Sequence, residues 1–407
     1  MSLLAVEARR TRWHGRPACT LSNGVVELTH LTGGGHIADF HAADVPALNP
    51  FSIPQWNSRD PTRFRPAHDE SEFGPAAVGK LLSGIAGHSL CLGVFGMPSE
   101  EELAAGAVLH GEAGVRSWTA TARSGRDEGR LRFSVRLPAF GLNFTREIVL
   151  RPGESVVRVR ESVCNLRATD QFIQWQQHAV LGPPFLDPAS CIVSLPGERG
   201  ITDPGDYEAR SALASNAEFT WPSAPGVNGG SLDLQRPCQK SGLGFVAGIQ
   251  IDPNRENAFV CAVNREQQLA FGYVFRRSQF PWVTLWEENC ARTAPPWLGR
   301  ERARAFEFGV SPLPIGRAAT LRRGDLFGTP TMLRIPAGGV VSAEWLMFLR
   351  RVPRGVACIR DVICRPNRLC LTPDAGRPLA MVAAGVADFL NAPQASAPRP
   401  RKARPGS

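Results

Sequence analysis

Two ionisable side chains stand inside runs of aromatic and apolar residues in this sequence. His178 lies within the run 172–181, and Glu307 lies between two phenylalanines in the run 305–309. An ionisable group in such a segment costs free energy unless it is paired or used. Histidine and glutamate are also side chains whose pKa modest tuning brings close to 7. These positions therefore suit proton transfer by a general acid and a general base.

A polar cluster follows directly after Trp286. Its members are Glu287, Glu288, Asn289 and Arg292. Such a concentration of hydrogen-bonding groups beside aromatic residues suits the binding of a polar ligand. Glu288 also competes with Glu307 for the role of general base, and it is the next residue to test if Glu307 proves buried or misdirected.

The segments that must position these residues alternate between apolar and polar side chains. Residues 130–137 and 155–163 show this period of two, and glycine-containing turns separate such runs. The pattern is typical of antiparallel strands in sheets that are covered on one face. The sequence has no βαβ rhythm, no glycine motif for nucleotide binding and no fixed-period repeat. It therefore predicts an all-β, mainly antiparallel fold with a few short helices.

Local signals predict several connections and helices. Asn23-Gly24 lies between two β-rich runs and predicts a hairpin over 18–31. Ser99 followed by three glutamates predicts a short capped helix. Residues 376–390 are expected to form an amphipathic helix.

Residues 49–80 have the composition of a long loop, rich in Pro, Asn, Arg and Asp. A long ordered loop usually serves binding. Arg63 and Arg65 in this loop are candidates to hold a hydroxyl or an anionic group.

The net charge of +9 on 407 residues comes almost entirely from arginine, because only three of the 46 basic residues are lysine. Four of the basic residues stand in the tail after residue 390, and elsewhere the arginines are interleaved with acids. A nucleic-acid binder usually concentrates them in one stripe with exposed aromatics. Nucleic acid is therefore not the expected partner.

The ten cysteines form no CxxC pair, and most of them sit in apolar runs. They are expected to be buried, reduced thiols in a reducing compartment. Cys358, Cys364 and Cys370 recur every six residues, but a zinc site there would lack its fourth ligand, so we interpret them as strand residues. We predict no metal and no cofactor.

The start of the chain lacks a hydrophobic segment of signal-peptide length, and no run approaches the roughly 20 apolar residues of a membrane span. A cytoplasmic protein without a membrane partner is expected. Residues 391–407 are rich in Pro, Ala, Ser and Arg and are expected to be disordered.

Segments 109–112, 175–185 and 282–309 together resemble the catalytic set of the aldose 1-epimerase (galactose mutarotase-like) superfamily. The strand-like segment 159–166 also resembles the family strand that precedes the catalytic histidine. The resemblance extends over roughly residues 18–350. It implies a galactose mutarotase-like β-supersandwich and an enzyme that interconverts sugar anomers by opening the ring.

The resemblance also implies a role for each ionisable residue. His178 would be the general acid that protonates the ring oxygen, Glu307 the base that deprotonates the anomeric hydroxyl, and His110 a ligand of the sugar near the ring oxygen. Glu307 points opposite to Phe306 and Phe308 along a strand. If the phenylalanines face the core, Glu307 faces the side of the sheet on which a sugar could lie.

Further side chains are expected to bind the sugar. They are Gln177, Trp286, Glu288, Asn289, Arg292 and Arg65, with Trp282 and Trp297 as additional stacking candidates. The family also carries a substrate-binding aspartate between acid and base, for which Asp203, Asp206 and Asp233 remain open. The residues that flank His178 differ from those of the characterised galactose mutarotases, so galactose is not implied as the substrate.

The expected domain plan has four parts. They are an N-terminal extension (1–17), the mutarotase-like β-sandwich (18–354), a C-terminal extension packed on it (355–390) and a disordered basic tail (391–407). The expected partner is a sugar or sugar phosphate, and the expected state is a monomer or homodimer. Two rival functions remain: a non-catalytic carbohydrate-binding protein, and a glycoside hydrolase or lyase in which Glu288 and Glu307 supply the two carboxylates.

Overall fold

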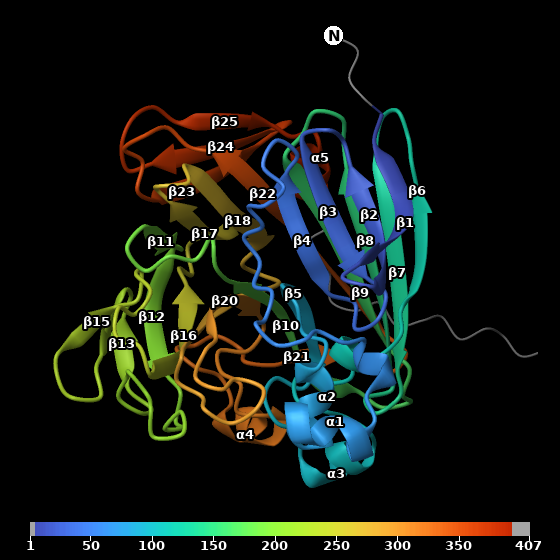
Figure 1. Cartoon of the computed structure of the whole chain (residues 1–407), viewed down its shortest axis with the longest axis vertical. Coiled ribbons are helices and arrows are strands. Elements are labelled where there is room, and N and C mark those ends of the chain that lie inside the picture. Colours follow the sequence, from blue (N-terminus) through green and yellow to red (C-terminus); the bar gives the residue numbers. More distant parts are fainter. Residues whose placement is uncertain (1–4, 393–407) are drawn as a thin grey trace, which may run out of the picture.

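The computed structural model describes residues 5–392. Most of the predicted disordered tail, from residue 393 on, lies outside the described residues. The chain folds into two large antiparallel sheets whose inner faces enclose the main hydrophobic core (Figure 1). The predicted all-β, mainly antiparallel class is confirmed.

The larger sheet holds the predicted site strands at its centre. In spatial order its strands are β1 (Glu7–Trp13), β2 (Arg16–Ser22), β3 (Val26–Leu31), β4 (Ile37–Ala42), β5 (His88–Gly93), β10 (Gln171–Leu181), β20 (Arg302–Gly309), β19 (Trp282–Asn289), β16 (Leu243–Ile251), β12 (Gly197–Thr202), β13 (Glu218–Thr220), β14 (Ser223–Pro225) and β15 (Ser231–Asp233), with β21 (Leu333–Ile335) beside β10. β19 and β20 are consecutive along the chain, whereas β10 comes from a distant part of it, so the sheet topology is what brings β10 beside β20.

The second sheet packs against the inner face of the first. Its order is β11 (Cys191–Ser194), β17 (Asn257–Asn264), β18 (Leu269–Arg276), β22 (Val340–Arg351), β9 (Val156–Asn165), β8 (Leu142–Leu150), β7 (Gly129–Leu137) and β6 (Thr119–Arg123). The period of two is clear in β7, where Leu131, Phe133 and Val135 are buried and the arginines between them are exposed. Burial of one face of each strand in this way fixes the register of the sheet.

A few short helices fill the connections, as predicted, but the expected long loop over residues 49–80 is wrong in its second half, which forms three of them. The helices are η1 (Pro61–Arg63), α1 (Pro66–Phe73), α2 (Ala76–Leu82), α3 (Glu100–Ala104), η2 (Ala113–Val115), α4 (Arg317–Arg323) and α5 (Gly385–Asn391). The capping box that Ser99 and Glu102 form at the start of α3 confirms the predicted capped helix. Within residues 5–392, no helix has the length and hydrophobicity to cross a membrane. Figure 1 shows α1, α2 and α3 gathered at the end of the sandwich opposite β23–β25.

The C-terminal segment packs on the outer face of the second sheet through its own apolar cluster. It forms a third sheet of β23 (Ile359–Arg365), β24 (Arg368–Pro373) and β25 (Leu379–Val382), followed by α5. The predicted helix over 376–390 is therefore wrong in its first half. Met381 and Ala383 are buried while Val382 between them is exposed, and this alternation favours a strand over a helix.

The predicted N-terminal extension needs correction. Residues 7–13 form β1, which pairs with β2 along its whole length, so the sandwich begins well before residue 18. This edge strand carries several charged and exposed side chains and therefore lacks the clean apolar alternation that marks an inner strand.

Candidate active site

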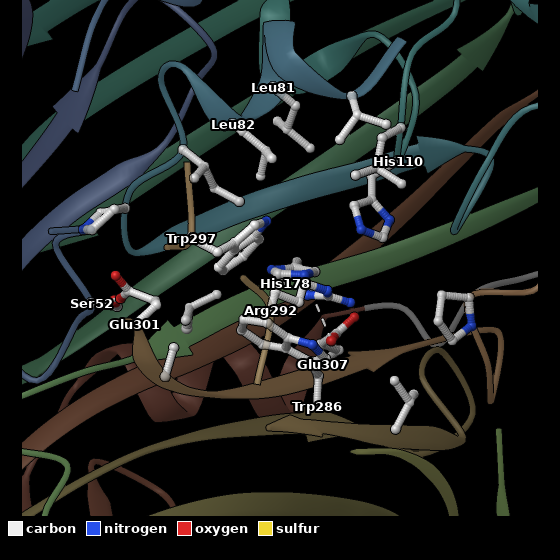
Figure 2. Close-up of a pocket in the computed structure, with 18 of the residues that line it drawn as sticks. Ser52, Leu81, Leu82, His110, His178, Trp286, Arg292, Trp297, Glu301 and Glu307 are labelled. Atoms are coloured by element: carbon white, nitrogen blue, oxygen red, sulfur yellow. Dashed lines mark hydrogen bonds and ion pairs between the residues drawn. The ribbon is translucent and has the colours of Figure 1, made fainter. Parts of the chain in front are cut away.

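His178 and Glu307 lie opposite each other on two neighbouring strands. β10 and β20 are hydrogen-bonded, and their register pairs residue 178 directly with residue 307. Directly paired residues project to the same face of a sheet. Both side chains therefore enter one cavity, where His178 Nε2 lies 3.6 Å from Glu307 Oε1 (Figure 2).

The residues that flank Glu307 fix its direction. Phe306 and Phe308 are buried in the core between the two sheets, so the alternation along β20 turns Glu307 to the opposite side. The predicted orientation of these three side chains is confirmed.

The cavity has a volume of about 470 Å³, which is within the usual range for small-molecule sites. It lies between the outer face of β10, β19 and β20 and the segment that contains α2 (Figure 2). Its polar lining comes from Ser52, His110, His178, Asp203, Tyr207, Glu208, Arg292, Glu301 and Glu307. Three tryptophans also reach it, namely Trp56, Trp286 and Trp297.

His110 enters the cavity from the segment between α3 and η2. Its ring centroid lies 5.1 Å from that of His178. The backbone N–H of Gly96 donates to His110 Nδ1 at 3.1 Å, so the proton of the neutral ring is on Nε2, which is then a hydrogen-bond donor. His110 itself has a φ of 63°, a left-handed conformation that is uncommon for a residue other than glycine.

Burial sets the protonation of the histidine–glutamate pair. It lowers the pKa of His178 to about 4 and raises the pKa of Glu307 well above its usual range. Burial also lowers the pKa of His110, and the neighbouring His178 and Arg292 lower it further. Both shifts act in the same direction, and they favour the form of the pair in which the histidines are uncharged and the proton is on Glu307.

The paired side chains keep unused hydrogen-bonding atoms. Within residues 5–392, neither His178 Nδ1 nor Glu307 Oε2 has a hydrogen-bond partner. Buried polar atoms without partners carry a free-energy cost, and they are expected at sites that exchange hydrogen bonds with a ligand.

The guanidinium group of Arg292 lies in the cavity among three aromatic rings. Its guanidinium carbon lies 4.4 Å from the ring centroid of Tyr207, 5.0 Å from that of Trp297 and 5.9 Å from that of Trp286. These distances are within the range of cation–π attraction. The rings hold the guanidinium in place beside the histidine–glutamate pair (Figure 2).

Glu288 positions this cluster from outside the cavity. It accepts hydrogen bonds from the backbone N–H of Arg292 at 3.0 Å and from the Tyr207 hydroxyl at 2.8 Å, and its Oε2 lies 3.6 Å from Arg292 Nη1. Tyr207 in turn accepts from Trp286 Nε1 at 2.8 Å. With its oxygens engaged in this way, Glu288 is placed as a support rather than as a second base.

Glu301 is a cavity carboxyl that the sequence reasoning missed. It accepts hydrogen bonds from the Ser52 hydroxyl at 3.4 Å and the Gln55 backbone N–H at 3.1 Å, and burial raises its pKa to about 7. The sequence does carry a signal for it. Every second residue of a strand points to the same face, so residue 301 is expected on the same side as residues 303, 305 and 307. Tyr207 was also missed, and it gave only a weak signal as one of two tyrosines in the chain.

Gln177 does not reach the cavity, and its predicted role in substrate binding is wrong. Its side chain lies between the sheets, where it donates to Glu161 Oε2 at 2.5 Å and its carbonyl oxygen accepts from His88 Nε2 at 3.0 Å. The cause is the strand period, since a neighbour of His178 must point to the other face of β10.

Three more predicted residues also lie away from the cavity. Asn289 donates to the backbone carbonyls of Cys238 and Lys240 at 2.8 and 3.1 Å. Arg65 lines a separate cavity, and Trp282 is buried with its Nε1 bonded to a backbone carbonyl. Of the three candidate aspartates, only Asp203 lines the cavity around His178.

Known proteins resemble this chain in structure rather than in sequence. No protein-family model matches the sequence, and no curated protein matches it. A candidate aldose 1-epimerase from Klebsiella pneumoniae superposes with a TM-score of 0.58 at 16% identity, over 84% of this chain and 83% of that one. A galactose mutarotase-like protein from Clostridium acetobutylicum gives 0.56 at 11% identity, over 86% and 99%.

The chain has the galactose mutarotase-like fold. A candidate aldose 1-epimerase from Escherichia coli has the same architecture, with a TM-score of 0.53 at 13% identity over 82% of this chain and 98% of that one. The fold predicted from the three short motifs is confirmed. Because one fold supports many activities, the function must be argued from the cavity itself.

Proposed function

We propose that the protein is an aldose 1-epimerase-like isomerase that interconverts sugar anomers by acid–base ring opening. The observation that carries the proposal is the pairing of His178 and Glu307 at 3.6 Å inside one cavity. The two oxygens that exchange protons in this reaction are bonded to the same carbon of the sugar. A close acid–base pair on one wall can therefore address both of them.

Ring opening moves two protons and breaks one bond. Glu307 takes the proton of the anomeric hydroxyl, His178 gives a proton to the ring oxygen, and the bond between the anomeric carbon and the ring oxygen breaks to give an open-chain aldehyde. Rotation about the next carbon–carbon bond exposes the other face of the carbonyl. Closure then reverses both transfers, so the pair ends with the protons it had at the start.

The protonation that burial favours matches one half of this cycle. After ring opening, Glu307 is protonated and His178 is neutral, which is the arrangement favoured by the raised and lowered pKa values of the two groups. Starting from the opposite arrangement, a His178 with a low pKa is a strong acid toward the ring oxygen. His110 Nε2 is a donor that can hold the sugar near this oxygen.

The activity is expected to fall on the acid side near pH 4, well below the usual pKa of histidine, and on the alkaline side as the pH rises through the raised pKa of Glu307. Below the His178 pKa of about 4, the pair carries two protons and has no base, whereas above the raised pKa of Glu307 it carries none and has no acid. Polarimetric measurement of kcat/KM against pH, with circular dichroism at each pH, tests this. A half-maximal point near 6.5 in folded protein would contradict the assignment.

Proton NMR of freshly dissolved sugars tests the proposed function directly. The β-anomer signal of α-glucose or α-galactose should grow faster with the protein than without it. Saturation-transfer signals from a bound sugar without any acceleration would favour the carbohydrate-binding alternative. The absence of acceleration for every aldose tried, including 6-deoxy sugars, would oppose the isomerase.

We further propose that the substrate is an uncharged sugar with an apolar edge. Four carboxyl groups line the cavity, and although Glu307 is the protonated member of its pair, the others still outnumber the one arginine, whose charge Glu208 and Glu288 already balance at 3.6 Å each. The wall opposite the acid–base pair is apolar and includes Val78, Leu81, Leu82 and Ile85. Such a cavity repels a phosphate group and favours hydrocarbon.

Glucose 6-phosphate is accordingly expected to react with a kcat/KM about 100-fold lower than that of glucose, since placing like charges together costs several kcal/mol. Anomer interconversion measured by NMR provides both values. The neutral 6-O-methylglucose serves as the control for bulk at the same carbon and should keep most of the activity. Equal or better reaction of the phosphate ester would exclude the proposed substrate class.

The hydrolase alternative requires two carboxylates across a cleft. The predicted pair of Glu288 and Glu307 does not meet this requirement, because Glu288 lies behind Arg292. Glu301 has a pKa of about 7 and lines the same cavity as Glu307, so these two are the carboxyl groups a hydrolase would use. Release of nitrophenol from aryl glycosides distinguishes this activity from anomer interconversion.

The ten cysteines are free thiols. Free thiols persist in a reducing environment, which supports the further proposal that the protein works in the cytoplasm.

A further inference from the structure

A second cavity of about 530 Å³ lies where the hairpin of β1 and β2 meets η1 and α1. Five arginines line it, and we refer to it as the arginine cavity. They are Arg12, Arg16, Arg59, Arg63 and Arg65. Arg65, which the sequence reasoning assigned to sugar binding, belongs to this second cavity.

The charge of the arginine cavity is not balanced by its own carboxylates. Asp60 and Asp69 are the acidic residues of its lining. Asp69 is committed to Arg59 at 2.7 Å. Among residues 5–392, the side chains of Arg12, Arg63 and Arg65 form no ion pair and no hydrogen bond, so three guanidinium groups are available.

Arg16 adds a buried cationic group to this lining. It is only 4% exposed, and its terminal nitrogens donate to the Ser58 hydroxyl and to the carbonyls of Gly84 and Gly33 at 2.7–3.0 Å. These partners are uncharged, and within the described chain its Nε has no partner at all. Burial lowers the pKa of Arg16 to about 10, and the charge of nearby Asp60 offsets only part of this effect. A buried cation with neutral partners and a spare donor is stabilised by an anion.

We propose that the arginine cavity binds a multiply charged anion of the phosphate class, either inorganic or carried on a small metabolite. Guanidinium groups match tetrahedral oxyanions because their N–H donors form paired hydrogen bonds. The unbalanced arginines attract the anion, and the buried Arg16 supplies a fixed donor. This site is separate from the cavity that contains His178 and Glu307, which we call the sugar cavity. The inference does not depend on the proposed isomerase activity.

The two cavities share one stretch of chain. Trp56 and Leu82 line the sugar cavity, whereas Ser58 and Ser83 line the arginine cavity. Trp56 Nε1 also donates to the Leu82 carbonyl at 2.9 Å. An anion in the arginine cavity therefore contacts the segment that forms the wall of the sugar cavity on its other side.

Isothermal titration of the full chain with inorganic phosphate, pyrophosphate and glycerol 3-phosphate tests the proposal. Sodium chloride is adjusted to a constant ionic strength, because surface charges are screened by salt. The double variant Arg63→Ala/Arg65→Ala removes two exposed side chains without partners, so the fold is expected to persist. It should lose at least about tenfold in affinity for the anion that the wild type binds, as charge-assisted hydrogen bonds are lost.

The matched control is Arg132→Ala/Arg136→Ala, which removes two exposed arginines from β7 on the other sheet. It should bind the anion as the wild type does. Stronger binding of glycerol 3-phosphate than of inorganic phosphate would identify an organic phosphate as the ligand, and the reverse would identify the free anion. Failure of all three probes to bind, or equal losses in both double variants, would overturn the proposal.

Discussion

Replacement of Glu307 by glutamine is expected to slow anomer interconversion by about 10²–10⁴-fold, because the amide keeps the shape of the side chain but cannot exchange the proton. His178→Asn should cause a loss of the same order. Residues that act as a unit are not additive, so the double variant should be about as slow as the slower single variant. The measurement is kcat/KM by NMR on the sugar that the wild type converts.

The stability of Glu307→Gln separates a catalytic defect from unfolding. Burial raises the pKa of Glu307, so the folded protein disfavours the carboxylate relative to the neutral form. Replacement of the Glu307 carboxyl group by an amide should therefore leave the unfolding midpoint unchanged or slightly higher at pH 7. The exposed Glu198 of β12 provides a control, and Glu198→Gln should keep both activity and stability. A folded Glu307→Gln variant with the wild-type rate would remove this residue from the mechanism.

The direction of Glu307 could be predicted from its immediate neighbours. Phe306 and Phe308 are large apolar residues that are expected to face the core. In a strand, the residue between them must then point to the opposite face. The same rule, applied to β10, would have excluded Gln177 as soon as His178 was assigned to the cavity. Local periodicity is therefore sufficient to orient a residue within its own strand.

The partners across strands could not be predicted in this way. Residues 178 and 307 meet because β10 and β20 are neighbours, and this follows from the topology of the whole sheet rather than from either segment. Arg65 illustrates the same limit for a loop, because its own segment does not reveal which of two adjacent cavities it lines. Arg292 was assigned to the site from its position in a polar cluster, and the structure places it in the cavity.

The largest expected loss of stability comes from a charge pair in the middle of the core. Arg146 on β8 and Glu161 on β9 are fully buried, with Nε and Oε1 2.7 Å apart. Gln177 reaches across from the other sheet and donates to Glu161. Glu161→Ala should lower the free energy of unfolding by about 3–5 kcal/mol, because it leaves the Arg146 cation buried without its counter-charge. Chemical denaturation monitored by circular dichroism provides the value.

A double-mutant cycle decides whether the pair or its separate members matter. The double variant Arg146→Leu/Glu161→Leu removes both charges together. Its loss in free energy of unfolding should be much smaller than the sum of the losses in Arg146→Leu and Glu161→Leu alone. The exposed pair of Arg199 and Glu218 has the same 2.7 Å separation, yet Glu218→Ala should cost less than about 1 kcal/mol because solvent already screens it. Equal losses in Glu161→Ala and Glu218→Ala would show that the core tolerates an unpaired Arg146. A larger loss in Glu161→Ala would show that the buried pair stabilises the core. Through its hydrogen bond with Gln177, the pair would then also hold β10, the strand that carries His178.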